Sequence, residues 1–140
     1  MVEYEELPDW VRSAVDAARA VRGRAYCPYS KFQVGAALVT DDGAIVSGAN
    51  VENASFGLTI CAERSAVCAA VAQGKTVFRC VAICAEMDQH YVGPCGACRQ
   101  VLVEFGDAMD VYLCRPQSGI LRTSVAELMP LSFNPRWVSF

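Results

Sequence analysis

Three cysteines and one carboxylate are the residues of this sequence best suited to chemistry. Cys95 and Cys98 stand three positions apart at the predicted start of a helix, which places both sulfurs on one side of its first turn. Cys61 stands at the start of another predicted helix, and Glu63 follows it by two residues. Because the free amides and the dipole of a helix N-terminus favour negative charge, they favour the thiolate form that binds metal.

This set of side chains indicates a zinc site with a catalytic role. Thiolates select zinc over harder cations, and three protein ligands leave the fourth tetrahedral position open for water. A carboxylate beside that open position can accept a proton from the water. We therefore predict one zinc ion per chain, held by Cys61, Cys95 and Cys98, with Glu63 as the catalytic proton acceptor and not as a ligand.

Two other kinds of site remain compatible with the same cysteines. A closed structural zinc site would recruit Cys27, Cys68 or Cys114 as its fourth ligand, and an isolated Cys-x-x-Cys pair could be redox-active. Cys80 and Cys84 lie inside an apolar run, and we interpret all five of these cysteines as buried thiols that pack as small hydrophobic side chains. The carboxylate two residues after the first zinc-binding cysteine favours the catalytic site.

Two further polar side chains lie near these motifs. Arg64 is either a surface cation or a donor to the thiolate sulfurs, where it would offset the excess negative charge of three thiolates on one zinc ion. His90, the single histidine, precedes the helix of Cys95, and we interpret it as a loop residue and not as a ligand.

The composition limits which kind of protein carries this site. A chain of 140 residues has room for one domain, so we expect a single catalytic domain over residues 1–140. With 54% hydrophobic and 19% charged residues, the chain can bury a core and is not a disordered segment. A net charge of −3 without a basic run disfavours nucleic acid and anionic membranes as partners.

The sequence also bears on where the protein works. No apolar stretch reaches the roughly 20 residues that a membrane-spanning helix needs. Residues 1–6 are acidic and lack the basic and apolar regions of a secretory signal. We therefore expect a cytoplasmic protein, in which the eight cysteines are free thiols or metal ligands.

Apolar periodicity predicts the elements that must position the site. Hydrophobic residues with helical spacing and Ala-rich composition predict helices over 8–21, 61–73 and 95–105, with Gly23, Gly74 and Gly106 at their ends. Alternating or continuous apolar residues predict strands over 32–38, 44–48, 77–85 and 110–114. The turn at 41–43 joins the first two strands in a hairpin, and Ser124 with Glu127 forms a capping box for a short last helix.

The order of these elements predicts the fold class. Strands separated by helices of this length imply parallel crossovers, so we expect an α/β protein, a three-layer α/β/α sandwich around one mixed β-sheet. Helices that follow neighbouring parallel strands begin at the same edge of a sheet. Cys61 is therefore expected to meet Cys95 and Cys98 at that edge.

The motifs together carry a specific family resemblance. The segments Cys61-Ala62-Glu63 and Pro94-Cys95-Gly96-Ala97-Cys98-Arg99-Gln100 resemble the zinc signature of the small cytidine deaminases of the three-cysteine type. The resemblance extends from Tyr26 through Phe133 and includes the stretches 28–37 and 50–54. It implies a cytidine deaminase-like fold and a homotetramer whose active sites are shared between subunits. It further implies hydrolytic deamination of cytidine and deoxycytidine in pyrimidine salvage.

The resemblance also implies a role for particular residues. It implies that Cys61, Cys95 and Cys98 hold zinc and that Glu63 shuttles protons. The implied substrate contacts are Phe32 packing on the base, Asn50 and Glu52 binding sugar hydroxyls, the Ala62 backbone contacting the pyrimidine, and Phe133 reaching a neighbouring subunit's site. Core packing for the two phenylalanines, and a turn position for the asparagine, are the alternatives.

Two departures and two rival functions accompany this hypothesis. Phe56 stands where relatives often carry Tyr, and residues 134–140 match no pattern of the family. Deamination of another aminopyrimidine nucleoside, such as a nucleoside antibiotic, is the rival within the fold, and a non-enzymatic zinc module is the rival outside it. A nucleic-acid deaminase is disfavoured, because such relatives usually carry His-x-Glu where this chain has Cys61-Ala62-Glu63.

Overall fold

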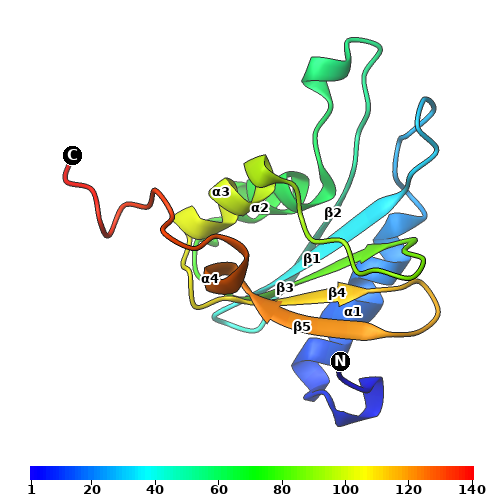
Figure 1. Cartoon of the computed structure of the whole chain (residues 1–140), viewed down its shortest axis with the longest axis horizontal. Helices are drawn as coiled ribbons and strands as arrows, with labels where there is room; N and C mark the ends of the chain where they lie inside the picture. The colour runs from blue at the N-terminus through cyan, green and yellow to red at the C-terminus, as the bar shows by residue number, and fades with distance from the viewer.

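A mixed β-sheet of five strands forms the centre of the computed structural model, which describes residues 1–140. The strand order is β2-β1-β3-β4-β5, and only β3 and β4 pair in parallel. The strands are β1 (Val34–Thr40), β2 (Ile45–Ala49), β3 (Phe78–Ala85), β4 (Asp110–Cys114) and β5 (Ile120–Ser124). Figure 1 shows them as one twisted layer.

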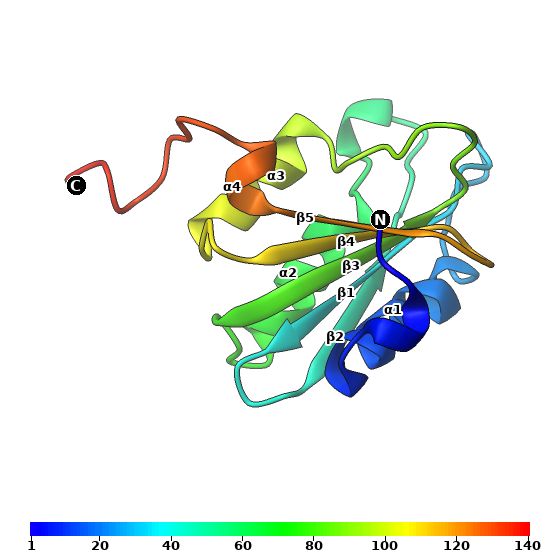
Figure 2. The ribbon, with the colours of Figure 1, turned by 60° about the horizontal axis from the view of Figure 1, so that its bottom comes forward.

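Helices cover both faces of the sheet. The helices are α1 (Asp9–Arg22), α2 (Ala62–Ala72), α3 (Gly96–Glu104) and the short α4 (Val125–Leu128). Residues of α1 belong to one hydrophobic core, whereas α2 and α3 contribute to a second core on the opposite face. Figure 2 shows α1 below the strands and α3 above them. The predicted three-layer α/β/α sandwich is therefore confirmed.

The central strand β1 shows why its sequence is almost entirely apolar. Ala36 and Leu38 point toward α2, and Ala37 and Val39 point toward α1. All four side chains are fully buried. A strand that is covered on both faces needs apolar residues at consecutive positions, because alternate side chains enter different cores.

Two glycines let the helices approach the sheet closely. A Cβ atom at Gly35 would lie 2.1 Å from the Ala18 carbonyl oxygen in α1. A Cβ atom at Gly48 would lie 2.4 Å from the Ala66 amide nitrogen in α2. Backbone therefore packs on backbone at both crossings, and the crossing at Gly48 fixes where α2, and hence Cys61 at its N-terminus, lies on the sheet.

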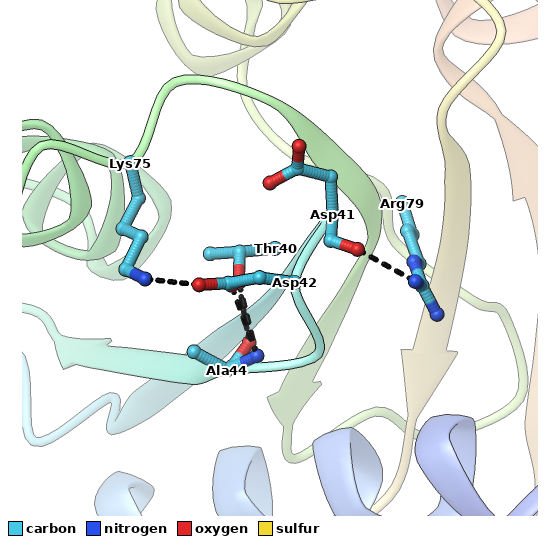
Figure 3. A network of polar contacts seen from close by, with 6 residues as sticks. All are labelled: Thr40, Asp41, Asp42, Ala44, Lys75 and Arg79. Carbon is cyan, nitrogen blue, oxygen red and sulfur yellow. Dashed lines mark hydrogen bonds and ion pairs between the residues drawn. The ribbon is translucent and has the colours of Figure 1, made fainter.

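A polar network surrounds the turn that joins β1 to β2 (Figure 3). The Asp42 carboxylate accepts a hydrogen bond from the Thr40 hydroxyl and pairs with Lys75, which follows α2. Arg79 of β3 donates to the Asp41 carbonyl at 2.6 Å. Hydrogen bonds from Lys75 and Thr40 hold the pKa of Asp42 well below its usual range. The network ties the hairpin turn to the segment between α2 and β3.

Most of the predicted elements agree with the structure to within a few residues. Gly74 and Gly106 follow α2 and α3 with φ of 78° and 134°, the left-handed region expected after a helix. The Ser124 hydroxyl caps α4 by accepting from the Glu127 amide at 3.2 Å. No helix in the chain has the length and apolar character that crossing a membrane requires.

Three expectations need correction. The sequence pattern did not indicate β5, which lies at the sheet edge with only Ile120 buried, so its side chains give a weak alternation. The strands β2 and β3 are not neighbours, because β1 lies between them, although both run antiparallel to β1 and hence in the same direction. Cys68 is exposed and not buried, since it lies on α2 opposite the buried face of Ala66 and Ala70.

Candidate zinc site and active-site pocket

The three cysteines of the predicted zinc site meet at one edge of the sheet. Cys61 and Cys95 are the N-cap residues of α2 and α3, and Cys98 lies in the first turn of α3. Their three Sγ atoms all lie within 4.8 Å of one another, and the Cys61 and Cys95 sulfurs are 3.9 Å apart. The meeting follows from the shared direction of β2 and β3, because each helix begins where its preceding strand ends.

The cluster contains three cysteines and no fourth cysteine or histidine. The candidates for a closing ligand, Cys27, Cys68 and Cys114, lie outside the cluster. His90 also lies outside it, on an exposed loop as expected. The geometry therefore contradicts a closed four-cysteine site within the chain and leaves one position of a tetrahedral ion open.

The pKa values of the Cys95 and Cys98 thiols are compatible with a site that releases thiol protons when it binds a metal ion. Burial raises the pKa of Cys95, but the amides of Cys98 and Ala97 and the neighbouring thiols together lower it below its ordinary value. Burial and the nearby Glu63 charge raise the pKa of Cys98. A bound Zn²⁺ would replace the Cys98 proton, since zinc binds the thiolate. Three such sulfur donors fit zinc.

The cysteines elsewhere have a different environment. Cys80 of β3 and Cys114 of β4 are fully buried in the core beneath α1. Burial raises the pKa of each thiol to about 12. These thiols are protonated at neutral pH and pack as small hydrophobic side chains, as predicted.

Arg64 points at the sulfur cluster. Its Nη2 atom donates to the Cys61 Sγ at 3.3 Å, one helical turn away on α2. Hydrogen bonds to Cys61 and then Cys98 raise the pKa of the guanidinium further above its ordinary value. The partly buried cation therefore lies where it can offset the charge of three thiolates.

Removal of this cation is expected to weaken the site. In Arg64→Ala we expect zinc affinity or turnover to fall about 10- to 100-fold, because a donor to the metal ligands is lost. Competition with a chromogenic zinc chelator measures the affinity. Arg24→Ala, which removes an exposed cation from a loop, is the matched control. If Arg64→Ala kept the zinc affinity and turnover of the wild type, the contact between Arg64 and the Cys61 sulfur would have no role in function.

Glu63 is the one carboxylate that is buried beside the cysteines. Its side chain is only 6% exposed, and its Oε2 atom accepts from the Cys98 thiol at 3.5 Å. Burial raises the pKa of Glu63 above its ordinary value. A desolvated carboxylate with a raised pKa binds a proton more tightly than one in water, which suits a general acid–base group.

A pocket of about 330 Å³ opens beside these residues. Its volume lies in the range of small-molecule sites. It brings together seven of the residues predicted from the sequence: Phe32, Asn50, Glu52, Cys61, Ala62, Glu63 and Cys95. Apolar side chains from β3 and the loop before α3 complete the wall: Ile83, Ala85, Met87 and Val92.

The pocket mouth is formed by Phe32 and the extended segment after β2. Phe32 is 49% exposed, so core packing does not account for it. Asn50 is buried, and its amide donates to the Phe32 carbonyl at 2.8 Å while its Oδ1 accepts from the Val34 amide at 2.9 Å. Glu52 accepts from the amides of the loop that carries Phe32. Asn50 and Glu52 thus hold this loop against the pocket.

Phe133 does not enter the pocket of its own chain. Its side chain is 62% exposed, and its carbonyl accepts from Gln100 Nε2 of α3 at 2.8 Å. The segment that follows it extends away from the sheet in both views (Figures 1 and 2). Phe56 is 73% exposed and packs on Tyr29 with ring centroids 5.7 Å apart, at the rim of the site.

Sequence reasoning missed several lining residues. Met87 and Val92 come from a loop without periodicity, so no local pattern marks them. Ser30 also lines the pocket and bonds to Glu52. The only signal for Ser30 was its place inside the 28–37 stretch, beside Phe32.

Known proteins resemble the chain in both sequence and structure. The family model described as the cytidine and deoxycytidylate deaminase zinc-binding region matches residues 8–114. A probable cytidine deaminase of Dictyostelium discoideum is 43% identical over 133 residues, which make up 95% of this chain and 87% of that protein. A cytidine deaminase from Burkholderia pseudomallei has a crystal structure similar at a TM-score of 0.82 and 46% identity, covering 86% of this chain and 97% of that one. A blasticidin-S deaminase of Bacillus cereus is 31% identical over 113 residues, 75% of this chain and 79% of that protein.

Proposed function

The chain belongs to the cytidine and deoxycytidylate deaminase family, and from this premise we propose that it is a zinc-dependent cytidine deaminase. It hydrolyses cytidine and deoxycytidine to uridine, deoxyuridine and ammonia in pyrimidine salvage. The observation that carries the proposal is that three cysteine sulfurs cluster beside the buried Glu63, at a pocket lined by Cys61, Cys95 and Glu63. The cofactor is one zinc ion per chain, held by Cys61, Cys95 and Cys98.

The chemistry is divided between the metal and one side chain. Zinc supplies the Lewis acidity that makes water nucleophilic near neutral pH. Glu63 accepts the proton of the attacking water and delivers it to N3 of the pyrimidine. Glu63 then takes the remaining proton from the hydroxyl added at C4 and gives it to the amino group, which leaves as ammonia as the C4 carbonyl forms. Its burial supports this role, because a raised pKa allows the carboxylate to hold the proton between the two transfers.

The lining of the pocket supports a neutral nucleoside as substrate. Phe32 packs on the base, the Ala62 backbone contacts the pyrimidine, and Asn50 and Glu52 bind the sugar hydroxyls. The 16 lining residues include two carboxylates and no lysine or arginine, so nothing there would pair with a phosphate. The five cysteines outside the zinc site are free thiols, which supports a reducing compartment and hence the cytoplasm.

A substrate panel tests the proposal directly. Cytidine, deoxycytidine, blasticidin S and free cytosine are incubated with the zinc-loaded protein, and pyrimidine product and ammonia are measured together. We expect both nucleosides to yield one ammonia per product, with far slower turnover of the antibiotic. Efficient turnover of blasticidin S alone would support the rival substrate class instead. Absence of any turnover would support a non-enzymatic zinc module.

Glu52 is expected to select against a phosphate on the sugar. In a polynucleotide the 3′ oxygen carries a phosphate, and a carboxylate that binds it as a hydroxyl would face a like charge. Glu52→Gln should weaken turnover of cytidine and reduce discrimination against cytidine 3′-monophosphate by about fivefold or more. Parallel assays with cytidine, the 3′-monophosphate and a short single strand measure this. Comparable wild-type turnover of strand and nucleoside would contradict the assignment.

The active form of the proposed enzyme is a homotetramer with shared sites. Support comes from exposed aromatic side chains on the C-terminal segment, of which Phe133, Trp137 and Phe140 are 62%, 77% and 96% exposed. Such side chains favour burial at an interface, where Phe133 would reach a neighbouring pocket. Light scattering of the active protein should therefore report four chains. An active monomer at nanomolar concentration would contradict this prediction.

A further inference from the structure

Residues 50–52 form an extended segment with its own backbone pairing. Val51 exchanges two hydrogen bonds with Ile60, both at 2.9 Å. On the other side, the Tyr26 amide donates to the Asn50 carbonyl and the Glu52 amide donates to the Tyr26 carbonyl, at 2.9 and 2.8 Å. Because alternate side chains of extended backbone share a side, Asn50 and Glu52 project together, and both line the pocket.

The Glu52 carboxylate is held by the loop that carries Phe32. Its Oε1 atom accepts from the Tyr29 amide at 3.0 Å and the Ser30 amide at 3.1 Å, and its Oε2 atom accepts from the Ser30 hydroxyl. An ionised carboxylate offers about four lone-pair sites. Three of these sites accept hydrogen bonds from the loop. These bonds fix the orientation of the carboxylate and so the direction of the lone pair that remains free.

The Ser30 hydroxyl connects this carboxylate to the base-facing residue. The Phe32 amide donates to the Ser30 Oγ at 3.0 Å. A hydroxyl has a single proton, so Ser30 donates that proton to Glu52 while it accepts from Phe32. Between them, Lys31 adopts a left-handed φ of 61°, which is uncommon for a residue other than glycine. The two hydrogen bonds of the Ser30 hydroxyl thus connect Glu52 to the backbone turn that ends at Phe32.

We propose that Ser30 is a positioning residue for nucleoside recognition, whose hydroxyl orients the Glu52 carboxylate toward the sugar and fixes it relative to Phe32. This inference rests on the proposed role of Glu52 as the sugar acceptor. Its physical basis is that a hydrogen bond to an ionised group is shorter and stronger than one between neutral groups. Without it, the carboxylate keeps its charge but loses the direction of its free lone pair.

The electrostatics agree with this arrangement. The Ser30 hydroxyl is the main cause of a lowered pKa at Glu52, with smaller contributions from the Ser30 and Tyr29 amides and the Lys31 charge, against an opposing effect of burial. Glu52 therefore remains ionised well below neutral pH and acts as an acceptor only. An acceptor of fixed direction is suited to select a sugar hydroxyl over a hydrogen at the same carbon.

Kinetics with two nucleosides that differ only in the 3′-hydroxyl test the role. In Ser30→Ala, KM for deoxycytidine should rise about tenfold or more, with kcat changed less than about threefold, because zinc and Glu63 are untouched. The preference for deoxycytidine over 2′,3′-dideoxycytidine should shrink by a similar factor. Ser30→Thr keeps the hydroxyl and should preserve both values. Ser47→Ala, an exposed serine of β2 without side-chain hydrogen bonds, is the matched control.

Two kinetic results would overturn the role. One is an unchanged preference between the two nucleosides in Ser30→Ala, and the other is an equal loss in Ser30→Thr. Carbon-13 NMR of the Glu52 carboxyl gives a readout that needs no turnover. Its pKa should be higher in Ser30→Ala than in the wild type and unchanged in Ser47→Ala, and an unshifted titration would also overturn the role. If the wild type deaminated neither nucleoside, the proposed function would fail, while the NMR titration would still decide whether Ser30 orients Glu52.

Discussion

Glu63→Gln is expected to lower cytidine turnover at least about 100-fold while zinc content and fold stay as in the wild type. The amide is nearly the same shape as the carboxylate, so the helix start at α2 and the packing around it are preserved. It cannot accept the proton of water or return one to the leaving amine. The loss should therefore fall on kcat, since Glu63 acts during the reaction and not in holding the substrate sugar.

Two measurements separate this outcome from damage to the metal site. Zinc per chain is determined by atomic absorption on the same sample that is assayed, and circular dichroism checks the fold. Glu104→Gln, at an exposed position on α3, is the matched control and should be fully active. Loss of zinc from Glu63→Gln would contradict the role of Glu63 as a proton carrier and favour a role as a ligand.

Cys98→Ser is expected to lose zinc and, with it, essentially all activity. Cys98 is fully buried, and its sulfur lies within 4.8 Å of the sulfurs of Cys61 and Cys95. A neutral hydroxyl is a poor zinc ligand, and two remaining thiolates do not fill a catalytic zinc site. Removing a ligand should cost more than removing Arg64, which acts on the metal only through sulfur.

The exposed cysteine of α2 provides a control for this variant. Cys68→Ser makes the same atomic replacement outside the cluster and should keep zinc and activity. Both variants are purified in parallel and compared for zinc per chain and turnover. Zinc content near the wild-type value in Cys98→Ser would refute the three-cysteine site.

The parts of the fold that could be predicted are those fixed by local sequence. Helix ends at Gly74 and Gly106, the capping box at Ser124 and the buried run of β3 depend on residues close together in the chain. The zinc site was also predictable, because each cysteine stands at a helix start and the direction of the crossovers brings those starts to one edge of the sheet.

Other features depend on pairing between distant segments and left little local signal. The edge strand β5 is half exposed, so neither alternation nor a continuous apolar run marks it. The strand β1 lies between β2 and β3 in the sheet. The sequence of a strand does not specify which other strands it pairs with, so this order could not be predicted. Cys68 illustrates a different error, since its apolar neighbours suggested burial whereas its helical position faces away from the sheet.

The residues that line the pocket could be predicted, but the hydrogen bonds that position them could not. Phe32, Asn50 and Glu52 followed from the family resemblance, and the structure brings all three to one cavity. The hydrogen bonds that position them run between the 26–34 loop and the 50–52 segment, and such contacts cannot be inferred from spacing. The position of Phe133 also could not be inferred from spacing, because the pocket that it is proposed to reach belongs to another chain.

The proposed activity depends on an open zinc site made by three cysteines of one chain beside Glu63. X-ray absorption spectroscopy at the zinc edge tests it most directly, because sulfur and oxygen scatter differently and their numbers can be fitted. We expect three sulfur ligands per zinc and one light-atom ligand in the purified wild-type protein. Four sulfur ligands would mean a closed structural site and would contradict the open three-cysteine site.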